Sequence, residues 1–172
     1  MDVDPLYPDP FGSLLQALGG LPGVGPKSAQ RIAFFLLGKP IEYARQLAGD
    51  IVLARDQMHH CTRCFFLAWG QDLCKICANP KRDGGQLMVV AEARDVVAIE
   101  KSQSYRGYYH VLGGVLSPLQ NVGVSDLRLT ELLQRLGQEP QPSELIFALP
   151  QSVEADATRS YIQHAITHLN LT

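Results

Sequence analysis

The segments Cys61-Thr-Arg-Cys64 and Cys74-Lys-Ile-Cys77 hold all four cysteines of the chain, in two pairs separated by nine residues. Two Cys-x-x-Cys pairs this close together can direct four thiolates at one Zn²⁺, with Zn–S distances of about 2.3 Å. Four protein ligands would leave the metal no open position for chemistry. We therefore predict a structural zinc ion held by Cys61, Cys64, Cys74 and Cys77.

Two disulfides or four reduced thiols are the alternatives to a metal site. The chain starts with Met1, Asp2, Asp4 and Pro5, which does not resemble the basic and then apolar run of a signal peptide. This start disfavours an oxidising compartment, and we expect a cytoplasmic protein. The polar segment 74–80 is too short to bury a core of its own. Metal binding is accordingly expected to supply most of its folding free energy, on the order of 10 kcal/mol.

Aromatic residues and histidines surround the cysteines in the sequence. Phe65, Phe66 and Trp69 are expected to cover the metal site and not to bind a partner. His59 and His60 could replace a thiolate as ligands, but with four cysteines available we interpret them as residues at the end of a helix.

The composition describes a folded chain with no strong overall charge. Of the 172 residues, 46% are hydrophobic and 19% are charged, which excludes a disordered or fibrous chain. No apolar run reaches the ~18 residues that a membrane helix needs, so we expect no membrane association. The net charge of −2 gives no whole-chain signal for nucleic acid. A nucleic-acid function must therefore rest on a local motif.

Apolar residues at helical spacing predict three helices in residues 1–58. Pro26 and Pro40 suit the first turns of the second and third helices. We expect the third helix to pack on the first two. The apolar faces comprise Phe11, Leu14, Leu15 and Leu18; then Ile32, Ala33, Phe35 and Leu36; then Ile41, Ala44, Leu47, Ala48, Ile51 and Val52.

The first two helices are joined by a glycine hairpin that carries cations. Gly23 and Gly25 permit backbone angles that other residues resist. Amides at a helix N-terminus attract phosphate, and Lys27 and Arg31 lie one turn apart on the same helix face. We predict that this helix-hairpin-helix holds a DNA backbone without reading its sequence. A simple turn between two helices is the alternative, although a turn does not need two glycines and paired cations.

From residue 83 onward, strands and helices alternate. This order predicts a parallel sheet with helices on its faces, and ligand sites in such sheets lie at the carboxyl ends of the strands. The expected strands are 87–91, 108–112 and 145–149, and the expected helices are 94–101, 125–136 and 152–169.

Carboxylates follow two of these strands. Glu92 and Asp95 come after the first strand, and Glu154 and Asp156 come after the third. They could hold Mg²⁺ and support phosphoryl chemistry. Alternatively, they are acidic residues that the helix dipole favours in a first turn. No pair of nucleophile and base accompanies them, which counts against a catalytic site.

Together these motifs resemble the RecR family of bacterial recombination mediators. The resemblance runs from residue 11 to about 169 and rests on LPGVGPKSAQRIAFFLL, the four cysteines followed by NPKRD, and RDVVAIE, YRGYYHVLGG and LSP. It implies a Toprim domain, DNA contacts by Lys27 and Arg31, and no catalytic activity. It also implies partnership with RecO, and with RecF where present, in loading recombinase onto single-stranded DNA at gaps. Family members form rings.

The chain departs from the family pattern in three places. Ala91 stands where Toprim domains usually carry a glutamate, with Glu92 displaced by one position. Pro150 and Ala155 replace a polar residue and a glycine. Beyond residue 172 the family continues for roughly one more strand and a tail. Its absence would leave a strand edge without the expected neighbour.

These observations lead to one organisation and two functions. We expect a helical helix-hairpin-helix module at 1–58, a four-cysteine zinc finger at 59–82 and a Toprim-like α/β domain at 83–172. The first hypothesis is a non-catalytic DNA-binding mediator, associated with the bacterial nucleoid and assembled as a dimer or a tetrameric ring. The alternative is a Mg²⁺-dependent Toprim-type nuclease or phosphotransferase.

Overall fold

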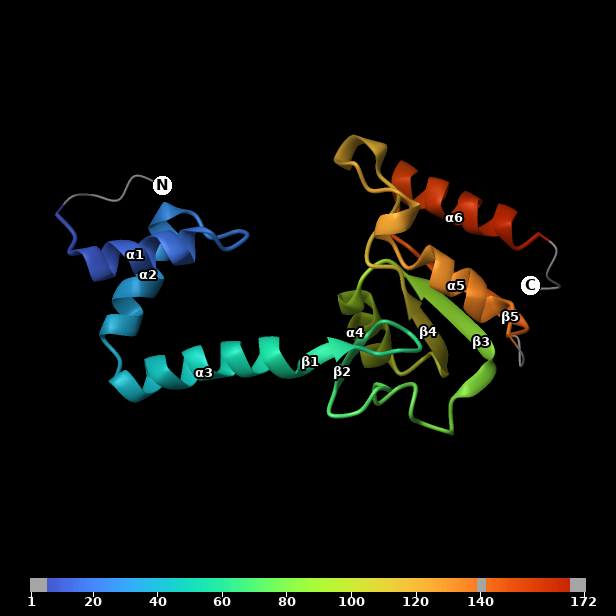
Figure 1. Ribbon diagram of the computed structural model, residues 1–172, viewed down its shortest axis with the longest axis horizontal. Helices are drawn as coiled ribbons and strands as arrows, with labels where there is room; N and C mark the ends of the chain where they lie inside the picture. The colour runs from blue at the N-terminus through green and yellow to red at the C-terminus, as the bar shows by residue number, and fades with distance from the viewer. Residues whose placement is uncertain (1–5, 139–141, 168–172) are drawn as a thin grey trace. The chain divides into compact units, whose positions relative to one another are not determined.

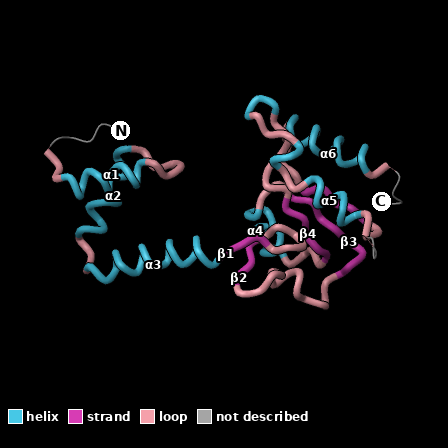
Figure 2. Tube along the Cα trace, viewed as in Figure 1, coloured by secondary structure: helices cyan, strands magenta, loops and turns pink. Residues whose placement is uncertain are grey.

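A computed structural model describes residues 6–138 and 142–167 of the chain (Figure 1). The chain divides into two compact units, Met1–Asp56 and Gln57–Thr172. Strands occur only in the second unit among the residues described (Figure 2). In the same residues, no helix combines the length and apolar character needed to span a membrane.

The first unit contains helices α1 (Asp9–Gly19), α2 (Pro26–Leu37) and most of α3 (Ile41–Gln57). Its core lies between α1 and α2, where Phe11 and Leu15 pack against Ala29 and Ala33. Both alanines are fully buried, and their small side chains let the two helices approach closely. The predicted apolar face of the first helix is confirmed by this packing.

The expected packing of the third helix on the first two is wrong. None of the residues of α3 is buried, and Ile51 is 63% exposed. Phe35, predicted to point inward, is half exposed and meets α3 only through an edge-to-face contact with Tyr43, with ring centroids 5.9 Å apart. Helical spacing identifies an apolar face, but it does not identify what covers that face.

The second unit is built on a parallel three-stranded sheet, as predicted, and its strands lie in the order β4-β3-β5. The strands are β3 (Asp83–Val90), β4 (Gly107–Val111) and β5 (Glu144–Ala148). Both neighbours of β3 run parallel to it.

Alternate residues of β3 point to two different helical layers. Leu87 and Val89 share a core with α5 (Leu129–Leu136) and α6 (Val153–Ala165). Val90 packs instead with Val96 of α4 (Ala93–Ser102). The sheet is therefore covered on both faces.

Two local predictions in this unit are wrong. The helix expected over 125–136 is divided into a short 3₁₀ turn (Val124–Asp126) and α5, because Leu127 between them is extended and buried in the core. His59 and His60 do not end a helix but lie in β1 (Met58–His60), which pairs antiparallel with β2 (Leu67–Trp69). A further 3₁₀ turn spans Pro118–Gln120. The predicted end of the last helix, at residue 169, lies outside the described residues.

Candidate metal centre and nucleic-acid interface

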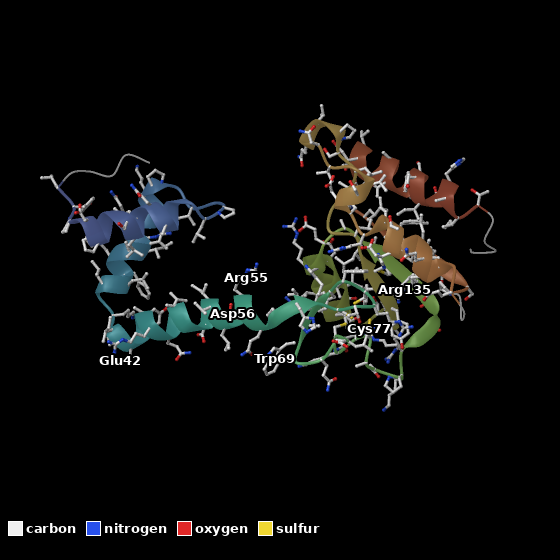
Figure 3. All side chains as sticks on the ribbon, in the orientation of Figure 1. Glu42, Arg55, Asp56, Trp69, Cys77 and Arg135 are labelled. Carbon is white, nitrogen blue, oxygen red and sulfur yellow. The ribbon has the colours of Figure 1, made fainter. Side chains whose placement is uncertain are left out.

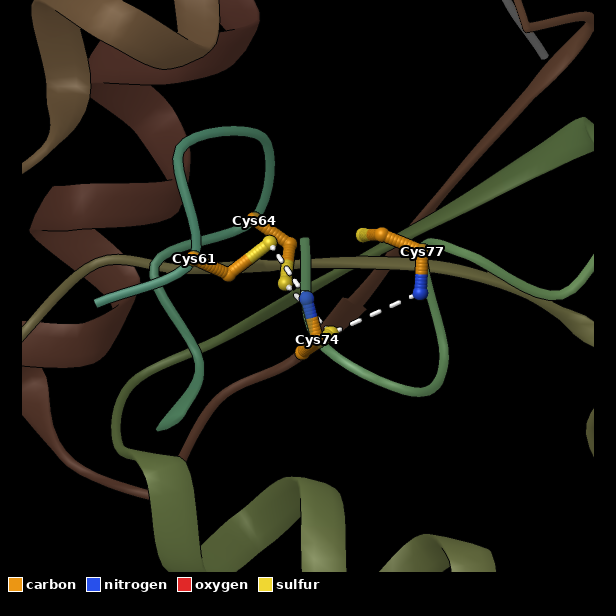
Figure 4. A group of neighbouring side chains, drawn as sticks. All are labelled: Cys61, Cys64, Cys74 and Cys77. Atoms are coloured by element: carbon orange, nitrogen blue, oxygen red, sulfur yellow. Dashed lines mark hydrogen bonds between the residues drawn. The ribbon is translucent and has the colours of Figure 1, made fainter. Parts of the chain in front are cut away.

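The four cysteines meet in one buried cluster beside the β1-β2 hairpin (Figure 4). Their sulfur atoms all lie within 4.8 Å of one another. A tetrahedral zinc–thiolate site with bonds of about 2.3 Å requires sulfur atoms about 3.8 Å apart, so the cluster fits such a site after a small contraction. None of the four cysteines forms a disulfide, so all four sulfur atoms can serve as metal ligands.

Backbone amides and neighbouring thiols act on the sulfur atoms of this cluster. The amide of Cys74 donates to the Cys61 sulfur at 3.3 Å, and the amide of Cys77 donates to the Cys74 sulfur at 3.4 Å. Hydrogen bonds with Cys64 and Cys77 lower the pKa of Cys74, while hydrogen bonds with Cys74 and Cys77, together with burial, raise the pKa of Cys64. The donor set and its burial suit a divalent metal that prefers sulfur ligands.

Of the three nearby aromatic residues, Phe66 covers the cysteine cluster as predicted, whereas Phe65 packs in the core that contains Val90 and Val96. Phe66 packs directly on the cysteines, and Phe65 lies edge-on to His110 with ring centroids 5.3 Å apart. Trp69 was expected to join them, but it is 69% exposed and donates a 2.8 Å hydrogen bond to Gln57 instead. The prediction for Trp69 is therefore wrong.

The hairpin between α1 and α2 uses its two glycines differently. Gly23 has a φ of +79°, a conformation that favours glycine. Gly25 has a φ of −79° and a ψ of 172°, which any residue adopts, and it forms the N-cap of α2. Among the described residues, neither amide has a hydrogen-bond acceptor. Both N–H groups are free to bind an external acceptor.

Lys27 and Arg31 follow on the first turns of α2. Both side chains are exposed, and in the described part of the chain neither forms an ion pair with a carboxylate. Two cations one helical turn apart, next to open amides at a helix N-terminus, form a local anion-binding surface. We call Gly23, Gly25, Lys27 and Arg31 the hairpin surface.

Local contacts already occupy most of the carboxylates that follow the strands. Asp95 accepts a 2.8 Å hydrogen bond from the Glu92 amide, and Glu92 pairs with Arg94 at 2.9 Å. Asp156 pairs with Arg159 at 2.7 Å. In the residues described, the cysteine cluster is the group arranged to hold a metal ion, and the four carboxylates form no such group.

Comparison with known proteins agrees with this architecture. Residues 11–55 match the family described as RecR, helix-hairpin-helix, and residues 85–172 match the Toprim domain. A protein named Recombination protein RecR from Synechococcus elongatus is 44% identical over 157 residues, which cover 91% of this chain and 78% of that protein. The chain belongs to the RecR family.

Further relatives support this assignment. The RecR protein of Carboxydothermus hydrogenoformans is 46% identical over 95% of this chain and 81% of its own length. That of Cutibacterium acnes is 40% identical over 97% of this chain and 82% of its own length. The helical segment is thus a helix-hairpin-helix, the parallel sheet is a Toprim domain, and the chain has a role in recombination and repair.

Sequence reasoning missed the side chains that join the cysteine segment to the sheet. Arg82 donates to the backbone oxygens of Tyr105 and Gly107 at 3.3 Å and pairs with Glu100, which also accepts a hydrogen bond from Tyr109 at 2.7 Å. Burial would raise the pKa of Glu100, but Arg82 and Tyr109 together hold it below the ordinary value. These partners lie far apart in sequence, so no local pattern reveals them.

Proposed function

We propose that this chain is a DNA-binding mediator of recombination that has no catalytic activity of its own. It acts with RecO, and with RecF where present, to help load recombinase onto single-stranded DNA at gaps. The observation that supports this most directly is the hairpin surface, which combines two open amides with two unpaired cations. Membership of the RecR family supports the biological setting.

The hairpin surface is suited to a phosphate backbone. The amides of Gly23 and Gly25 lie just before the N-terminus of α2, where the helix dipole attracts anions, and Lys27 and Arg31 add two full charges beside them. Phosphate oxygens alone can accept the hydrogen bonds that these groups donate, so no contact with a base is required. Binding is therefore independent of DNA sequence and decreases as salt rises.

The cysteine cluster is proposed to hold zinc for a structural purpose. Cys61, Cys64, Cys74 and Cys77 supply four sulfur ligands, and bound zinc fixes the fold of the segment without taking part in a reaction. We propose that the chain works as three parts: the helical module 1–58, the zinc finger 59–82 and the Toprim domain 83–172. The Toprim carboxylates Glu92, Asp95, Glu154 and Asp156 are proposed to contact protein partners.

A homo-oligomer is the proposed working form. The exposed apolar side chains of α3 argue for a second copy, because the described residues of its own unit leave this helix without a buried side chain. Exposed apolar surface of this kind marks an interaction site. We propose that a dimer or a tetrameric ring buries it.

Binding to single-stranded DNA tests the proposal. A variant with Lys27→Ala and Arg31→Ala should bind a single-stranded oligonucleotide at least tenfold more weakly than the unmodified chain does, since each charge-assisted contact contributes about 1.5–3 kcal/mol. A variant with Arg45→Ala and Arg55→Ala loses the same charge from exposed positions on α3 and serves as the matched control. Equal affinity of both double variants would refute the hairpin assignment.

A Mg²⁺-dependent nuclease or phosphotransferase is the alternative. Its support is the position of two acidic pairs after adjacent parallel strands. The capping and ion-pair contacts of Asp95, Glu92 and Asp156 weigh against it. Cleavage of end-labelled DNA or RNA with Mg²⁺ or Mn²⁺, abolished by Asp156→Asn, would establish the alternative in place of the mediator.

A further inference from the structure

Arg135 is a largely buried cation that forms no ion pair in the described part of the chain. It lies in the last turn of α5, far in sequence from the cysteines. The four ion pairs among the described residues involve Arg82, Arg94, Arg128 and Arg159, each with its own carboxylate. A guanidinium stays charged in proteins, so burying one without an anion is costly.

The contacts of Arg135 lead to the metal centre. One of its terminal nitrogens donates to the backbone oxygen of Tyr109 in β4 at 2.7 Å and to that of Arg63 at 3.2 Å. Arg63 stands between Cys61 and Cys64, so the second bond holds the peptide that joins the first pair of cysteines. Figure 3 labels Arg135 and Cys77 in the same unit.

Charge explains why this arginine needs no carboxylate. Four thiolates and one Zn²⁺ carry a net charge of about −2, which is itself buried. Burial and the like charge of Arg63 lower the pKa of Arg135, whereas the thiolates of Cys77, Cys64 and Cys61 raise it. The thiolates of the cysteine cluster therefore stabilise the charged form of this guanidinium.

We propose that Arg135 is a positioning residue for the metal centre: it fixes the peptide between Cys61 and Cys64 and compensates the charge of the metal–tetrathiolate. This inference rests on the proposed zinc site. It means that retention of the metal depends on the Toprim domain, since α5 supplies the cation. Partners of this kind outside the ligand set commonly change metal affinity by about 10–100-fold.

The test is metal release from the full chain. Zinc-loaded Arg135→Gln, which keeps a hydrogen-bond donor but loses the charge, should transfer its zinc to a colorimetric chelator at least tenfold faster than the unmodified chain. Arg135→Lys, which keeps the charge, should restore much of the difference. Arg159→Gln, which removes an exposed ion-paired arginine on α6, is the control and should release zinc at the original rate.

Cobalt substitution supplies a second readout that a purely structural role would not change. The thiolate-to-Co²⁺ absorption of the Arg135→Gln protein should shift relative to that of the Arg135→Lys protein, because the charge beside the sulfurs differs. Should Arg135→Gln fail to fold, Arg135→Lys compared with Arg159→Gln still decides: lysine keeps the charge but not the guanidinium's two bonds to backbone oxygens, so its zinc release should be about two- to threefold faster than that of the control. Equal release rates and equal spectra in all variants would overturn the proposal.

The zinc site and the role of Arg135 can fail separately. If the unmodified chain takes up no zinc, or if Cys64→Ser takes up as much as the unmodified chain, the proposed metal centre itself is wrong. If the unmodified chain holds one zinc ion and Arg135→Gln holds it equally tightly, only the inference about Arg135 is wrong.

Discussion

At the scale of single residues, His110 is a histidine whose protonation is controlled by burial. Its side chain is fully buried, one ring nitrogen bonds to the Arg128 oxygen at 2.8 Å, and Nδ1 has no partner among the described residues. Burial lowers the pKa of His110 to about 4. The ring is therefore neutral in the folded protein at neutral pH.

This burial makes stability depend on pH. The unfolded chain binds a proton at His110 below its ordinary pKa of about 6.5, whereas the folded chain does so only near 4. The free energy of unfolding should accordingly fall between pH 6.5 and 4, by up to about 3 kcal/mol. Urea unfolding followed by Trp69 fluorescence at pH 7 and pH 5 measures the change.

A variant that lacks the titratable imidazole of His110 separates this effect from the release of metal in acid. His110→Phe should lose stability at pH 7 through the missing hydrogen bond, but its decline from pH 7 to pH 5 should be smaller. His164→Gln changes an exposed histidine on α6 and should keep the original decline. Identical declines in both variants would show that His110 does not titrate as described.

The two hairpin glycines provide a matched pair of substitutions. Gly23→Ala places a side chain at a φ of +79° and should destabilise the hairpin by about 1–2 kcal/mol. Gly25→Ala has an ordinary φ and open space around its new Cβ, so its effect should be much smaller. Hydrogen exchange of the α1 and α2 amides compares the two, and faster exchange in Gly25→Ala than in Gly23→Ala would contradict the assignment.

At the scale of elements, α3 is the helix whose sequence and surroundings disagree. Its apolar residues are spaced for burial, yet Ile51, Val52 and Leu53 are all more than half exposed. A second copy of the chain is the proposed cover. An interface between two copies would bury the apolar side chains of α3 and so account for their helical spacing.

Charge on this face should weaken the oligomer. Ile51→Glu places a carboxylate within the proposed interface and should lower the mass measured by light scattering toward that of a single chain. Gln46→Glu adds the same charge on α3 at a polar position and should leave the mass close to that of the unmodified protein. An unchanged mass for Ile51→Glu would exclude α3 as the interface.

Elements were predictable where the pattern is local and repeated. The four cysteines, the glycine hairpin and the three parallel strands were predicted from spacing, and the structure brings the cysteines together. Features set by distant contacts were not predictable. The break at Leu127 and the pairing of β1 with β2 depend on residues that approach only in the folded chain.

The same distinction applies to the site residues. Cys61, Cys64, Cys74 and Cys77 share one short segment, so their spacing reveals them. Arg135 is 58 residues beyond Cys77 and reaches the backbone oxygen of Arg63, between Cys61 and Cys64, only because α5 packs on the sheet. A single sequence carries no signal for such a partner.

At the scale of the whole molecule, charge is local. The net charge is −2, so the chain as a whole does not attract nucleic acid. Under the proposed function, DNA binding is assigned to the hairpin surface, which forms part of the first unit only. Substitutions in the hairpin surface should therefore leave the fold of the Toprim domain intact.

The salt dependence of binding to single-stranded DNA tests the central claim most directly. Each neutralised phosphate contributes about 0.7 to the slope of log K against log salt concentration. If Lys27 and Arg31 hold phosphates, the double alanine variant should have a slope shallower by about 1.4 than that of the unmodified chain, and the Arg45 and Arg55 control should not. Equal slopes for all three proteins would contradict the account.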